Sequence, residues 1–586
     1  MLVFLTGWIK LIITFMAISI GQIGRGQFGS KILSKLKNLE VDIKWIAGSE
    51  DKWWLKDKVD WVIVATPNEF HYEQSKHFLS RGINVFCEKP AAFNTKAVEE
   101  LYNLADENNC KFYVDDVLFY EDIEETDYFL YRKWGSKFSN IIDRIAYHHF
   151  YLIAEDVNYK LDYTLNLFKN ETLVKQFTLI FGDKDYKFDY NFDWYKQKEH
   201  NIISTNDRDA LETMLDLVVT GKANYKDNKK RTIFATKLSQ ELKEKLYGKI
   251  AIIGAGIYGT TAALKLANRG YIVDLFEAKE SILSATSAIN QYRVHRGYHY
   301  PRSKETIISC RDNEKEFKRY YAGAIIDNVE HYYAIASENS STTARDYLHV
   351  LDECDLEWMM VDPLPGCDLT VRAKESLFCP ETLKLICEQR LLGCNVNVLL
   401  NNKVKNIDEL KGYQYKIVAT YSSLNDFDHD EKDYQYELCE KPVFELPEEY
   451  LNKSVVVMDG PFMCFDPYST TKFHVGGNVV HAIHNRNIGV DAEIPPSYRD
   501  LLNKGIVKNP KFTNVPRFIE SAKKFFPDIE KAKHIGSMFT IRTVLPNMDK
   551  TDGRPTLVRF EDDKIYLFSG KVGNCVEAAR EIINKI

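Results

Sequence analysis

The chain has 586 residues, of which 27% are charged and 45% hydrophobic, and its formal net charge is -7. This composition is ordinary for folded globular domains, and the length allows several separate cores. Because no block of lysine or arginine occurs, we expect small-molecule partners and neither nucleic acid nor an anionic membrane. The 11 cysteines form no CxxC pair. We therefore expect no disulfide framework, no metal site and a reducing, cytoplasmic environment.

The chain begins with a largely apolar stretch, before a strand-like run that starts at residue 16. Lys10 interrupts this stretch, and a membrane-spanning helix would consume the strand that the next motif requires. We therefore predict an apolar N-terminal extension over residues 1–15 rather than a membrane segment.

Gly24, Gly26 and Gly29 form a G-x-G-x-x-G motif directly after an apolar run and before a helix-like segment. In this setting the glycines allow a dinucleotide pyrophosphate to approach the backbone, and the helix N-terminus supplies N–H donors. Short apolar strands and helix-like stretches then alternate, as is typical of a parallel sheet with both faces covered. The strands are near residues 42–47, 61–66 and 83–86, and the helices are near 73–80 and 95–108. Residues 16–120 are thus predicted to form a Rossmann-type nucleotide-binding domain.

Further motifs follow in a fixed order, namely Ala65-Thr66-Pro67-Asn68 with His71, then Gly82, then Glu88-Lys89-Pro90. They resemble the Gfo/Idh/MocA family of NAD(P)-dependent sugar and polyol dehydrogenases, over roughly residues 16–245. The resemblance implies nucleotide contacts from Thr66, Pro67, Asn68 and Glu88. It also implies that Lys89 contacts the substrate hydroxyl beside the nicotinamide, where an ammonium stabilises a developing alkoxide. The alternative is a lysine at a strand end that keeps its charge in water.

The same family carries an Asp-x-x-x-His element whose histidine acts as acid or base. When His148 is aligned with that histidine, Arg144 stands where the family has aspartate. Either Asp143 reaches the site from a shifted register and His148 is catalytic, or the proton-transfer pair is broken and His148 is structural. His149 is the second candidate for this role.

The end of the second predicted strand decides which nicotinamide cofactor fits. NAD-binding domains place a carboxylate there for the ribose hydroxyls, whereas this chain has Gly48 and Ser49. Small polar residues leave room for a 2′-phosphate, and Lys52 is close by in the sequence. In a longer turn Glu50 would bind the ribose of NAD. The cofactor is therefore predicted to be NAD or NADP.

Beyond the first sheet the hydrophobic pattern changes to a period of two, which marks half-buried antiparallel strands. The alternation is seen at Leu161, Tyr163, Leu165 and Leu167 and again at Phe188, Tyr190, Phe192 and Trp194. A helix capped near Asn206 follows. We predict a small α+β substrate domain over residues 121–236, whose open sheet could serve homo-oligomer formation, and a connecting helix and hinge over residues 237–248.

A second G-x-G-x-x-G motif, formed by Gly254, Gly256 and Gly259, again lies between a strand-like run and a helix-like segment. Glu277 ends the next predicted strand, eighteen residues after the last glycine. A carboxylate at that distance accepts hydrogen bonds from the ribose hydroxyls of an adenine dinucleotide. The alternative is an exposed charge at a strand end.

Several later segments resemble the D-amino-acid-oxidase-like (DAO) family of FAD-dependent oxidoreductases. They are residues 287–303, Val418-Ala419-Thr420, Arg542 before Asp552-Gly553-Arg554-Pro555, and residues 567–573. The resemblance covers residues 249–586 and implies that a substrate C–H delivers hydride to the flavin. It implies FAD contacts from Ser287, Asn290, Arg293, Thr420, Gly570 and Gly573. We expect FAD-binding parts near residues 249–310, 366–425 and 536–586 and substrate-domain parts near 311–365 and 426–535.

Two further groups are candidates for the flavin substrate site. His295, with Arg293 and Tyr298, either faces the flavin ring or satisfies loop carbonyls. In amino-acid-oxidising members of the family an arginine on the strand that matches Arg542 pairs with the substrate carboxylate. Alternatively, Arg542 faces solvent or pairs with a protein carboxylate such as Asp549 or Asp552.

The predicted fold class is α/β and α+β, with two Rossmann-type nucleotide-binding domains, each associated with an antiparallel-sheet substrate domain. The predicted function is a bifunctional fused oxidoreductase. Its first half would be an NAD(P)-dependent dehydrogenase of a sugar-like or polyol substrate, and its second half would oxidise an amine or hydroxy compound with FAD. The alternative is an FAD-dependent oxidoreductase whose first half only binds a nucleotide or ligand, or mediates assembly.

Overall fold

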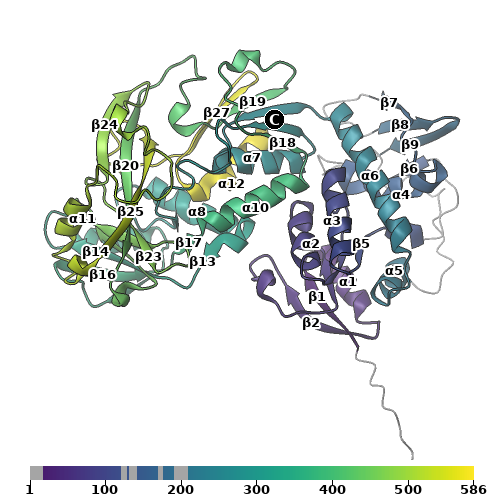
Figure 1. Ribbon diagram of the computed structural model, residues 1–586, viewed down its shortest axis with the longest axis horizontal. Helices are drawn as coiled ribbons and strands as arrows, with labels where there is room; N and C mark the ends of the chain where they lie inside the picture. Colours follow the sequence, from purple (N-terminus) through teal and green to yellow (C-terminus); the bar gives the residue numbers. More distant parts are fainter. Residues whose placement is uncertain (1–16, 121–127, 131–141, 169–175, 190–208) are drawn as a thin grey trace, which may run out of the picture.

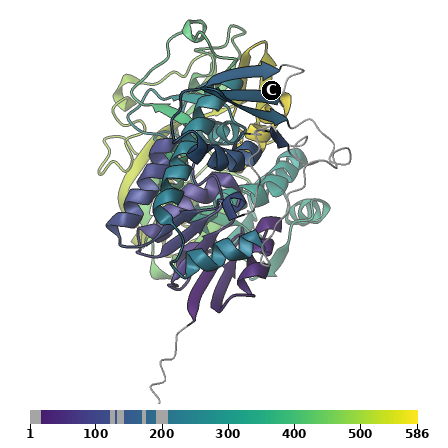
Figure 2. The same cartoon turned by 90° about the vertical axis from the view of Figure 1, so that its right-hand side faces the viewer.

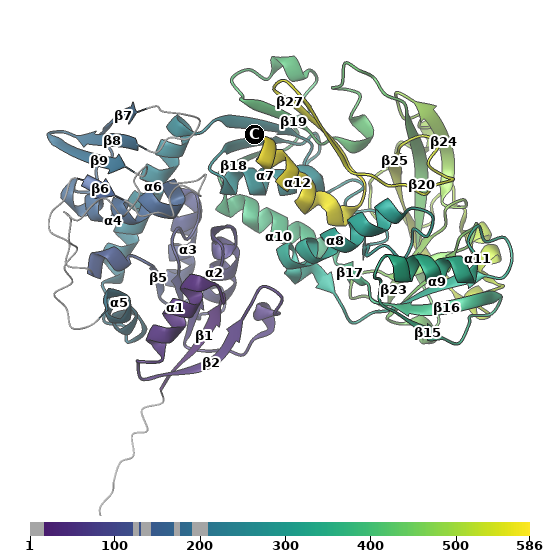
Figure 3. The ribbon, with the colours of Figure 1, turned by 180° about the vertical axis from the view of Figure 1, so that it is seen from behind.

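A computed structural model describes residues 17–120, 128–130, 142–168, 176–189 and 209–586 (Figure 1). The predicted extension over residues 1–15 and the helix cap near Asn206 lie outside the described residues. The first half of the chain and the second half form two lobes that lie side by side, as the view from behind also shows (Figure 3), and the first lobe faces the viewer in the view from the side (Figure 2). Among the described residues, no helix combines the length and the apolar character needed to cross a bilayer.

The first lobe is built on a five-stranded parallel sheet in the order β2-β1-β3-β4-β5. Its strands are β1 (Ile18–Ile23), β2 (Val41–Ala47), β3 (Trp61–Val64), β4 (Asn84–Cys87) and β5 (Phe112–Val114). Helices α2 (His71–Leu79) and α3 (Thr95–Glu107) cover one face, and α1 (Gln27–Leu36) and α5 (Ala210–Val219) cover the other. The strands read as continuous apolar runs because both faces are buried.

Helix α5 corrects one predicted boundary. It falls within the range expected for the substrate domain, yet Leu211, Met214 and Val218 pack on the nucleotide-binding sheet. These apolar residues recur at helical spacing and need a buried face, and the parallel sheet offers one. The sequence pattern alone cannot say which sheet a helix will cover.

A second sheet of the first lobe has the order β6-β9-β8-β7. Its strands are β6 (Tyr128–Leu130), β7 (Thr164–Phe168), β8 (Gln176–Phe181) and β9 (Lys184–Asp189). The β7-β8-β9 part is antiparallel, but β6 runs parallel to β9, so the sheet is mixed. Tyr190, Phe192 and Trp194 of the second predicted strand lie outside the described residues. Helices α4 (Tyr147–Asp156) and α6 (Tyr225–Leu246) bury its inner side chains. Whether this sheet mediates homo-oligomer formation stays a prediction.

The predicted hinge over residues 237–248 is the last part of α6 and the residues that lead into the next strand. Phe234, Leu238 and Leu242 stay buried on one face across the predicted boundary at residue 237. Since no glycine or proline interrupts this stretch, the helix continues through the boundary.

The second lobe contains a six-stranded sheet in the order β18-β11-β10-β19-β27-β26, parallel except for β26. Its strands are β10 (Lys249–Ile253), β11 (Ile272–Phe276), β18 (Val396–Leu399), β19 (Tyr415–Val418), β26 (Leu557–Glu561) and β27 (Lys564–Phe568). Helices α7 (Ile257–Asn268), α10 (Pro380–Gly393) and α12 (Cys575–Lys585) share one core with this sheet. The mixed α/β class with a parallel sheet is thus confirmed.

A nine-stranded mixed sheet forms the rest of the second lobe in the order β15-β16-β14-β21-β22-β23-β20-β24, with β25 paired to β20. Its strands are β14 (Glu330–Ala336), β15 (Trp358–Val361), β16 (Cys367–Ala373), β20 (Tyr434–Glu445), β21 (Lys453–Met458), β22 (Cys464–Pro467), β23 (Phe473–Gly477), β24 (Ile483–Gly489) and β25 (Lys533–Val544). Strands β16 and β25 fall in or overlap ranges that we expected to bind FAD, but they join this sheet instead. Strand pairing between distant segments decides this, and local patterns do not report it.

Helix α8 (Lys304–Tyr320) packs on α12 and carries Phe317 into the core beneath the six-stranded sheet. Helices α9 (Ala344–Glu353) and α11 (Val515–Ala522) pack against the large sheet. Three short strands, β12 (Arg293–Val294), β17 (Ser376–Phe378) and β13 (Ile325–Ile326), form a small separate sheet.

The two lobes meet where α2 of the first packs against α10 of the second. Arg390 on α10 forms a 2.7 Å ion pair with Glu73 on α2, and these side chains are only 5% and 9% exposed. The same guanidinium donates a 2.7 Å hydrogen bond to the carbonyl oxygen of Tyr320. A buried charge is tolerated only when it is paired and hydrogen-bonded, so this ion pair requires the two lobes to stay in contact.

A second contact joins the loop after β4 to the end of α10. The Phe93 amide donates to the Gly393 carbonyl at 2.8 Å. The Asn94 side chain donates to the carbonyls of Leu392 at 2.8 Å and Cys394 at 3.0 Å. A Cβ atom at Gly393 would lie 2.7 Å from Cβ of Tyr72. The interface is therefore packed closely enough to require glycine at this position.

We expect Glu73→Gln to lower the free energy of unfolding by about 3 kcal/mol, because Arg390 would remain buried without a carboxylate partner. The double variant Glu73→Leu with Arg390→Met should recover most of this loss, since it removes both charges. Urea unfolding, followed by circular dichroism, measures both effects. Lys523→Ala, which breaks exposed ion pairs to Glu520 and Glu530, serves as the control and should leave the midpoint unchanged.

Candidate functional sites

The Gly24 turn has the shape required to hold a diphosphate. Gly24 has a φ of +106°, and a Cβ atom there would clash with the Ala65 carbonyl, whereas one at Gly29 would lie 2.5 Å from the Gly24 carbonyl oxygen. Gly26 caps α1, and a Cβ atom there would have no other atom within 4 Å. The outer two glycines therefore permit close packing, and the middle one leaves open space at a helix N-terminus.

Gln22 supports this turn, and the sequence analysis did not single it out. Its buried side-chain amide donates to the carbonyls of Gly24 at 2.9 Å and Gly29 at 2.8 Å. A polar residue within an otherwise apolar strand was the available signal.

The end of β2 presents groups of both charges. The Asp51 carboxylate accepts hydrogen bonds from the Gly48 amide at 2.6 Å and from Arg25 at 2.7 Å. Arg25 also donates to the Ile46 carbonyl at 2.9 Å. The carboxylate that closes this turn is thus Asp51 rather than Glu50, and Arg25 brings a cation beside it. This arrangement is compatible with ribose hydroxyls or with a 2′-phosphate.

A cavity of about 700 Å³ runs along these turns. The predicted residues that line it are Gly24, Gly26, Gly29, Ser49, Thr66 and Pro67. Asn68 and Glu88 lie outside this lining. Burial, followed by the charge of Asp115, raises the pKa of the Glu88 carboxyl well above its ordinary range. The environment beside Asp115 therefore favours the protonated form of the Glu88 carboxyl.

Lys89 lies deeper, with 6% of its surface exposed. Burial and then the Lys89 charge lower the pKa of His148 well below its ordinary value. The same two causes lower the pKa of His149 to about 3. The Lys89 side chain thus lies in the neighbourhood of two buried imidazoles, and its charge disfavours the protonated form of both. One group can hold a substrate oxygen while a neighbour accepts a proton.

Asp143 belongs to this region, but its carboxylate is bound by α6. It forms a 2.9 Å ion pair with Lys243, in which both side chains are fully buried, and accepts a 2.6 Å hydrogen bond from Ser239. Its backbone carbonyl lies 3.5 Å from Nζ of Lys89. The structure therefore engages the Asp143 carboxylate through Lys243, a residue that the sequence analysis did not name.

The second glycine turn repeats the design of the first. Gly254 has a φ of +99°, and a Cβ atom there would lie 2.6 Å from the Ala419 carbonyl oxygen. Gly259 has no room for a side chain beside the Gly254 carbonyl. At the end of β11, the Glu277 carboxylate accepts hydrogen bonds from the amides of Ala255 at 2.9 Å and Lys279 at 3.0 Å. The predicted carboxylate thus lies directly at the glycine turn.

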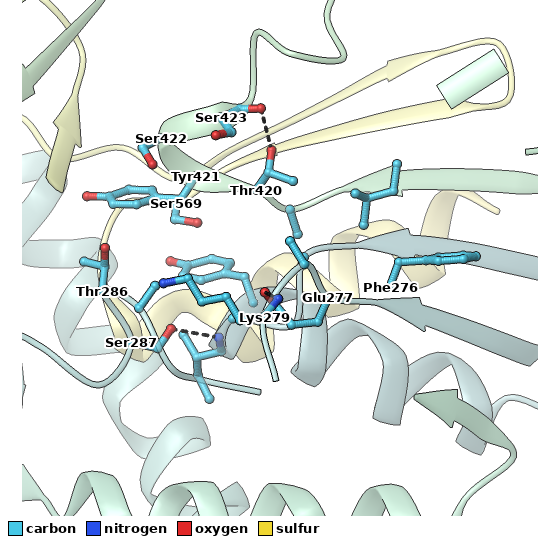
Figure 4. A pocket seen from close by; sticks show the side chains of 18 of the residues that line it. Phe276, Glu277, Lys279, Thr286, Ser287, Thr420, Tyr421, Ser422, Ser423 and Ser569 are labelled. Carbon is cyan, nitrogen blue, oxygen red and sulfur yellow. Dashed lines mark hydrogen bonds between the residues drawn. The ribbon is translucent and has the colours of Figure 1, made fainter. Parts of the chain in front are cut away.

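A second cavity of about 320 Å³ lies at this turn (Figure 4). The predicted residues that line it are Gly254, Gly256, Glu277, Ser287, Thr420 and Gly570. The Ser287 hydroxyl accepts a 3.0 Å hydrogen bond from the Ile257 amide at the start of α7. A Cβ atom at Gly573 would meet nothing within 4 Å, which leaves room before the final helix.

Asn290 and Arg293 do not line the second cavity. The Asn290 side chain donates to the carbonyls of Thr286 at 3.1 Å and Ser287 at 3.2 Å, so it shapes the loop. Arg293 forms a buried ion pair with Asp466 at 2.6 Å. Both residues therefore stabilise the loop rather than line the cavity. The sequence alone could not identify the partner of Arg293, because Asp466 lies far from it in the chain.

His295 belongs to a cluster that also contains Tyr300 and Lys571. Nε2 of His295 lies 3.3 Å from the Tyr300 hydroxyl, and Nζ of Lys571 lies 4.4 Å from the centre of the Tyr300 ring. Burial and then the Arg554 charge lower the pKa of Lys571 to about 7. Lys571 directly follows Gly570 of the second cavity. It lies within the segment 567–573, but the sequence analysis predicted no role for it. Tyr298 donates to the Glu357 carbonyl at 2.5 Å and is structural.

Arg542 pairs with Glu437, a fully buried carboxylate on β20 that also binds Arg486 at 2.8 Å. The partner is thus neither Asp549 nor Asp552. Asp549 pairs with Arg486 at 3.0 Å instead. The Arg542 side chain keeps 34% of its surface exposed, so a further contact to a substrate anion remains a prediction.

No group of three or more His, Cys, Asp and Glu side chains that could hold a metal ion occurs in the part of the chain that the structure describes. All 11 cysteines are free.

Comparisons with known proteins find one family match in each half of the chain. Residues 49–116 match the Gfo/Idh/MocA model, described as an oxidoreductase family with an NAD-binding Rossmann fold. Residues 249–360 match the DAO model, described as FAD dependent oxidoreductase. The chain thus combines segments similar to two oxidoreductase families. It is an oxidoreductase that has NAD(P) and FAD as its cofactors, and the open space at Gly26 and the Glu277 carboxylate fit these groups.

Individual known proteins are similar to each half. The FAD-dependent monooxygenase kojA of Aspergillus flavus is 26% identical over 365 residues, which cover 57% of this chain and 85% of that protein. The scyllo-inositol 2-dehydrogenase (NADP(+)) IolU of Bacillus subtilis is 46% identical over 52 residues, or 9% of this chain and 16% of that protein. Glycine oxidase from Geobacillus kaustophilus gives a TM-score of 0.45 at 12% identity, covering 57% of this chain and 94% of that one.

Lys571 provides a pH-dependent test of the second site. Its pKa of about 7 in the folded protein lies below the ordinary 10.5, so the unfolded chain binds more protons between these values. Its contribution to stability is therefore fully present above about pH 10.5 and is lost as the pH falls to about 7. In Lys571→Met we expect this dependence of the free energy of unfolding on pH to disappear and the free energy of unfolding at pH 7 to rise.

The measurement is urea unfolding of the FAD-loaded protein at a series of pH values from 7 to 10.5. Lys374→Met, which changes a lysine with 67% of its side chain exposed, serves as the control and should keep the slope. If the free energy of unfolding depends on pH equally steeply in Lys571→Met and in the parent protein, the lowered pKa of Lys571 is contradicted.

Proposed function

We propose that the chain is a bifunctional oxidoreductase. Its first half would oxidise or reduce a sugar-like or polyol substrate with NAD(P), and its second half would oxidise an amine or hydroxy compound with FAD. The observation that carries the first activity is the buried Lys89 beside His148 and His149. Burying three ionisable groups together costs free energy, and such groups are expected where a reaction uses them.

In the first half, Lys89 would hold the substrate oxygen, and His148 would accept its proton. Bound NAD(P) supplies a hydride acceptor for the substrate carbon. The lowered pKa keeps His148 in the neutral form from which a base must start, and a developing alkoxide at Lys89 would offset the positive charge that weakens it as a base. Once protonated, it would be repelled by the Lys89 ammonium, which favours rapid release of the proton. Lys243 would keep the Asp143 carboxylate in place behind this pair.

The scyllo-inositol dehydrogenase relative supports a cyclic polyol as substrate class for the first half, because its matched segment is 46% identical. For the second half, the monooxygenase relative supports a reaction in which dioxygen takes part. The cluster of His295, Tyr300 and Lys571 would contact the substrate of this half, and Arg542 would bind a carboxylate if the substrate carries one.

A second candidate function rests on the missing Asp-x-x-x-His element. Arg144 stands at the position of the family aspartate, and the Asp143 carboxylate is bound by Lys243. If no other group takes over proton transfer, the first half would bind NAD(P) or a ligand, or mediate assembly, without turnover. The flavin reaction would then be the sole activity.

We expect Lys89→Met to lower nicotinamide-linked turnover by roughly two to three powers of ten, because a preorganised charge beside the developing alkoxide is lost. Flavin reduction by the second substrate should not change. The measurement is NADPH formation from NADP+ and a panel of polyols, beginning with scyllo-inositol, with flavin absorbance as the second readout.

Lys96→Met serves as the matched control, because Lys96 is an exposed lysine on α3 outside the cluster. Turnover at the parent rate in Lys89→Met would contradict the catalytic role of Lys89. If the parent protein turns over no polyol with NAD+ or NADP+ but binds both, the binding-only function is favoured.

A further inference from the structure

The first cavity is not formed by the nucleotide-binding sheet alone. Its lining includes residues from the FAD-dependent half, namely Lys265, Glu316, Arg319, Tyr320, Ala322, Gly323 and Arg390. They belong to α7, to the end of α8, to the short turn Ala322–Ala324 and to α10. The cavity is therefore enclosed between the two lobes, which the ion pair of Arg390 and Glu73 holds together.

The position of the cavity along the first sheet indicates which part of a dinucleotide it would hold. Its lining comes from the ends of β1, β2 and β3 and from the start of α2, whereas Lys89 at the end of β4 lies outside it. A dinucleotide on such a sheet places its adenosine half near β1 and β2, and its other half across the point where the strand order reverses. The residues of the second lobe therefore face the adenosine half.

Tyr320 is the strongest indication of a ligand on this wall. It lines the cavity and is only 4% exposed, yet its hydroxyl has no hydrogen-bond partner among the described residues. A buried hydroxyl without a partner is costly, and most such groups are satisfied by protein, water or ligand. The Tyr320 ring itself is well packed, with Nζ of Lys265 at 3.8 Å and the Arg390 guanidinium at 4.9 Å from its centre.

The cations on this wall have different roles. Lys265 pairs with Glu69 at 3.3 Å, and Arg390 pairs with Glu73, so both are engaged in holding the lobes together. Arg319 contacts Glu316 at 3.5 Å and keeps 58% of its side chain exposed. Arg319 is thus the cation that can turn toward a ligand at little cost.

We propose that the FAD-dependent half supplies the second wall of the NAD(P) site, where Tyr320, Arg319 and Ala322 contact the adenosine half of the dinucleotide. The site would then exist only when the two lobes are packed together. Nucleotide binding would in turn stabilise the interface, because a ligand stabilises the state to which it binds. This inference rests on NAD(P) binding by the first half and needs no turnover there.

Helix α7 contributes residues to both cavities. Gly256 at its N-terminus lines the FAD cavity, and Lys265 near its C-terminus lines the NAD(P) cavity. The two nucleotides would share one helix as a wall while their binding residues remain separate. A change at Tyr320 or Ala322 is therefore expected to spare FAD.

The test uses the full-length, FAD-loaded protein and ADP-ribose, which carries the adenosine half without the nicotinamide. Loaded FAD prevents the probe from entering the second cavity. We expect Tyr320→Phe to weaken ADP-ribose binding about 3- to 10-fold, the usual worth of one hydrogen bond. The variant should be as stable as the parent protein without ligand, because it removes an unpaired buried hydroxyl. Calorimetric titration and thermal unfolding measure these effects.

Two further variants test the wall by size. Ala322→Trp should fill the cavity and abolish ADP-ribose binding, whereas Ala322→Ser should bind as the parent does. Arg319→Ala removes the exposed cation of the wall. Its control is Arg345→Ala, which removes an exposed arginine on α9, away from the cavity, and so reports the effect of losing a surface charge alone. FAD content, read from flavin absorbance, should be equal in all variants.

Gly26→Glu separates this inference from nucleotide binding itself. It places a carboxylate in open space at the N-terminus of α1 and should abolish binding from the first-half side. If the parent binds ADP-ribose and Gly26→Glu does not, but Tyr320→Phe and Ala322→Trp bind as the parent does, the second wall is refuted. If the parent binds neither ADP-ribose nor NADPH, nucleotide binding by the first half fails as well.

Discussion

The ion pair between Arg390 and Glu73 is the interaction on which the arrangement of the two lobes depends. Two long charged side chains are taken out of water, and their mutual contact offsets the loss of hydration, together with the hydrogen bond to Tyr320 and the contacts of the guanidinium with the rings of Phe70 and Tyr320. If the lobes separated slightly, each charge would remain partly buried without its partner. The interface is therefore held at one distance, and the packing of Gly393 against Tyr72 is consistent with that distance.

This constraint reaches the nucleotide sites because the same elements carry both. Helix α2 holds Glu73 and also lines the first cavity, and the loop that begins at Lys89 continues to Phe93 at the interface. In the second lobe, α8 ends at Tyr320, whose carbonyl binds Arg390. The NAD(P) site, the candidate catalytic lysine and the contact between lobes thus form one connected region rather than three separate features.

Buried cations in this protein are accommodated in different ways, and the difference indicates their roles. Lys243 is paired with Asp143, so its charge is compensated and it serves to position its neighbours. Lys571 lies near Arg554 and the Tyr300 ring, and burial lowers its pKa to about 7. A group that can exchange its proton near neutral pH is suited to chemistry, whereas a fully paired one is suited to structure.

The sequence by itself determined the two glycine turns, the carboxylate at Glu277, most strands of the first parallel sheet and the first two strands of the second, because these features depend on local spacing and on continuous apolar runs. It also placed Lys89 in a recognisable motif. Only the tertiary structure decided which sheet α5 covers, that Arg542 pairs with Glu437, and that Tyr320 lies on the wall of the first cavity. These outcomes depend on contacts between residues far apart in the chain, and the free energy of such contacts is set by burial and charge pairing that no local pattern records.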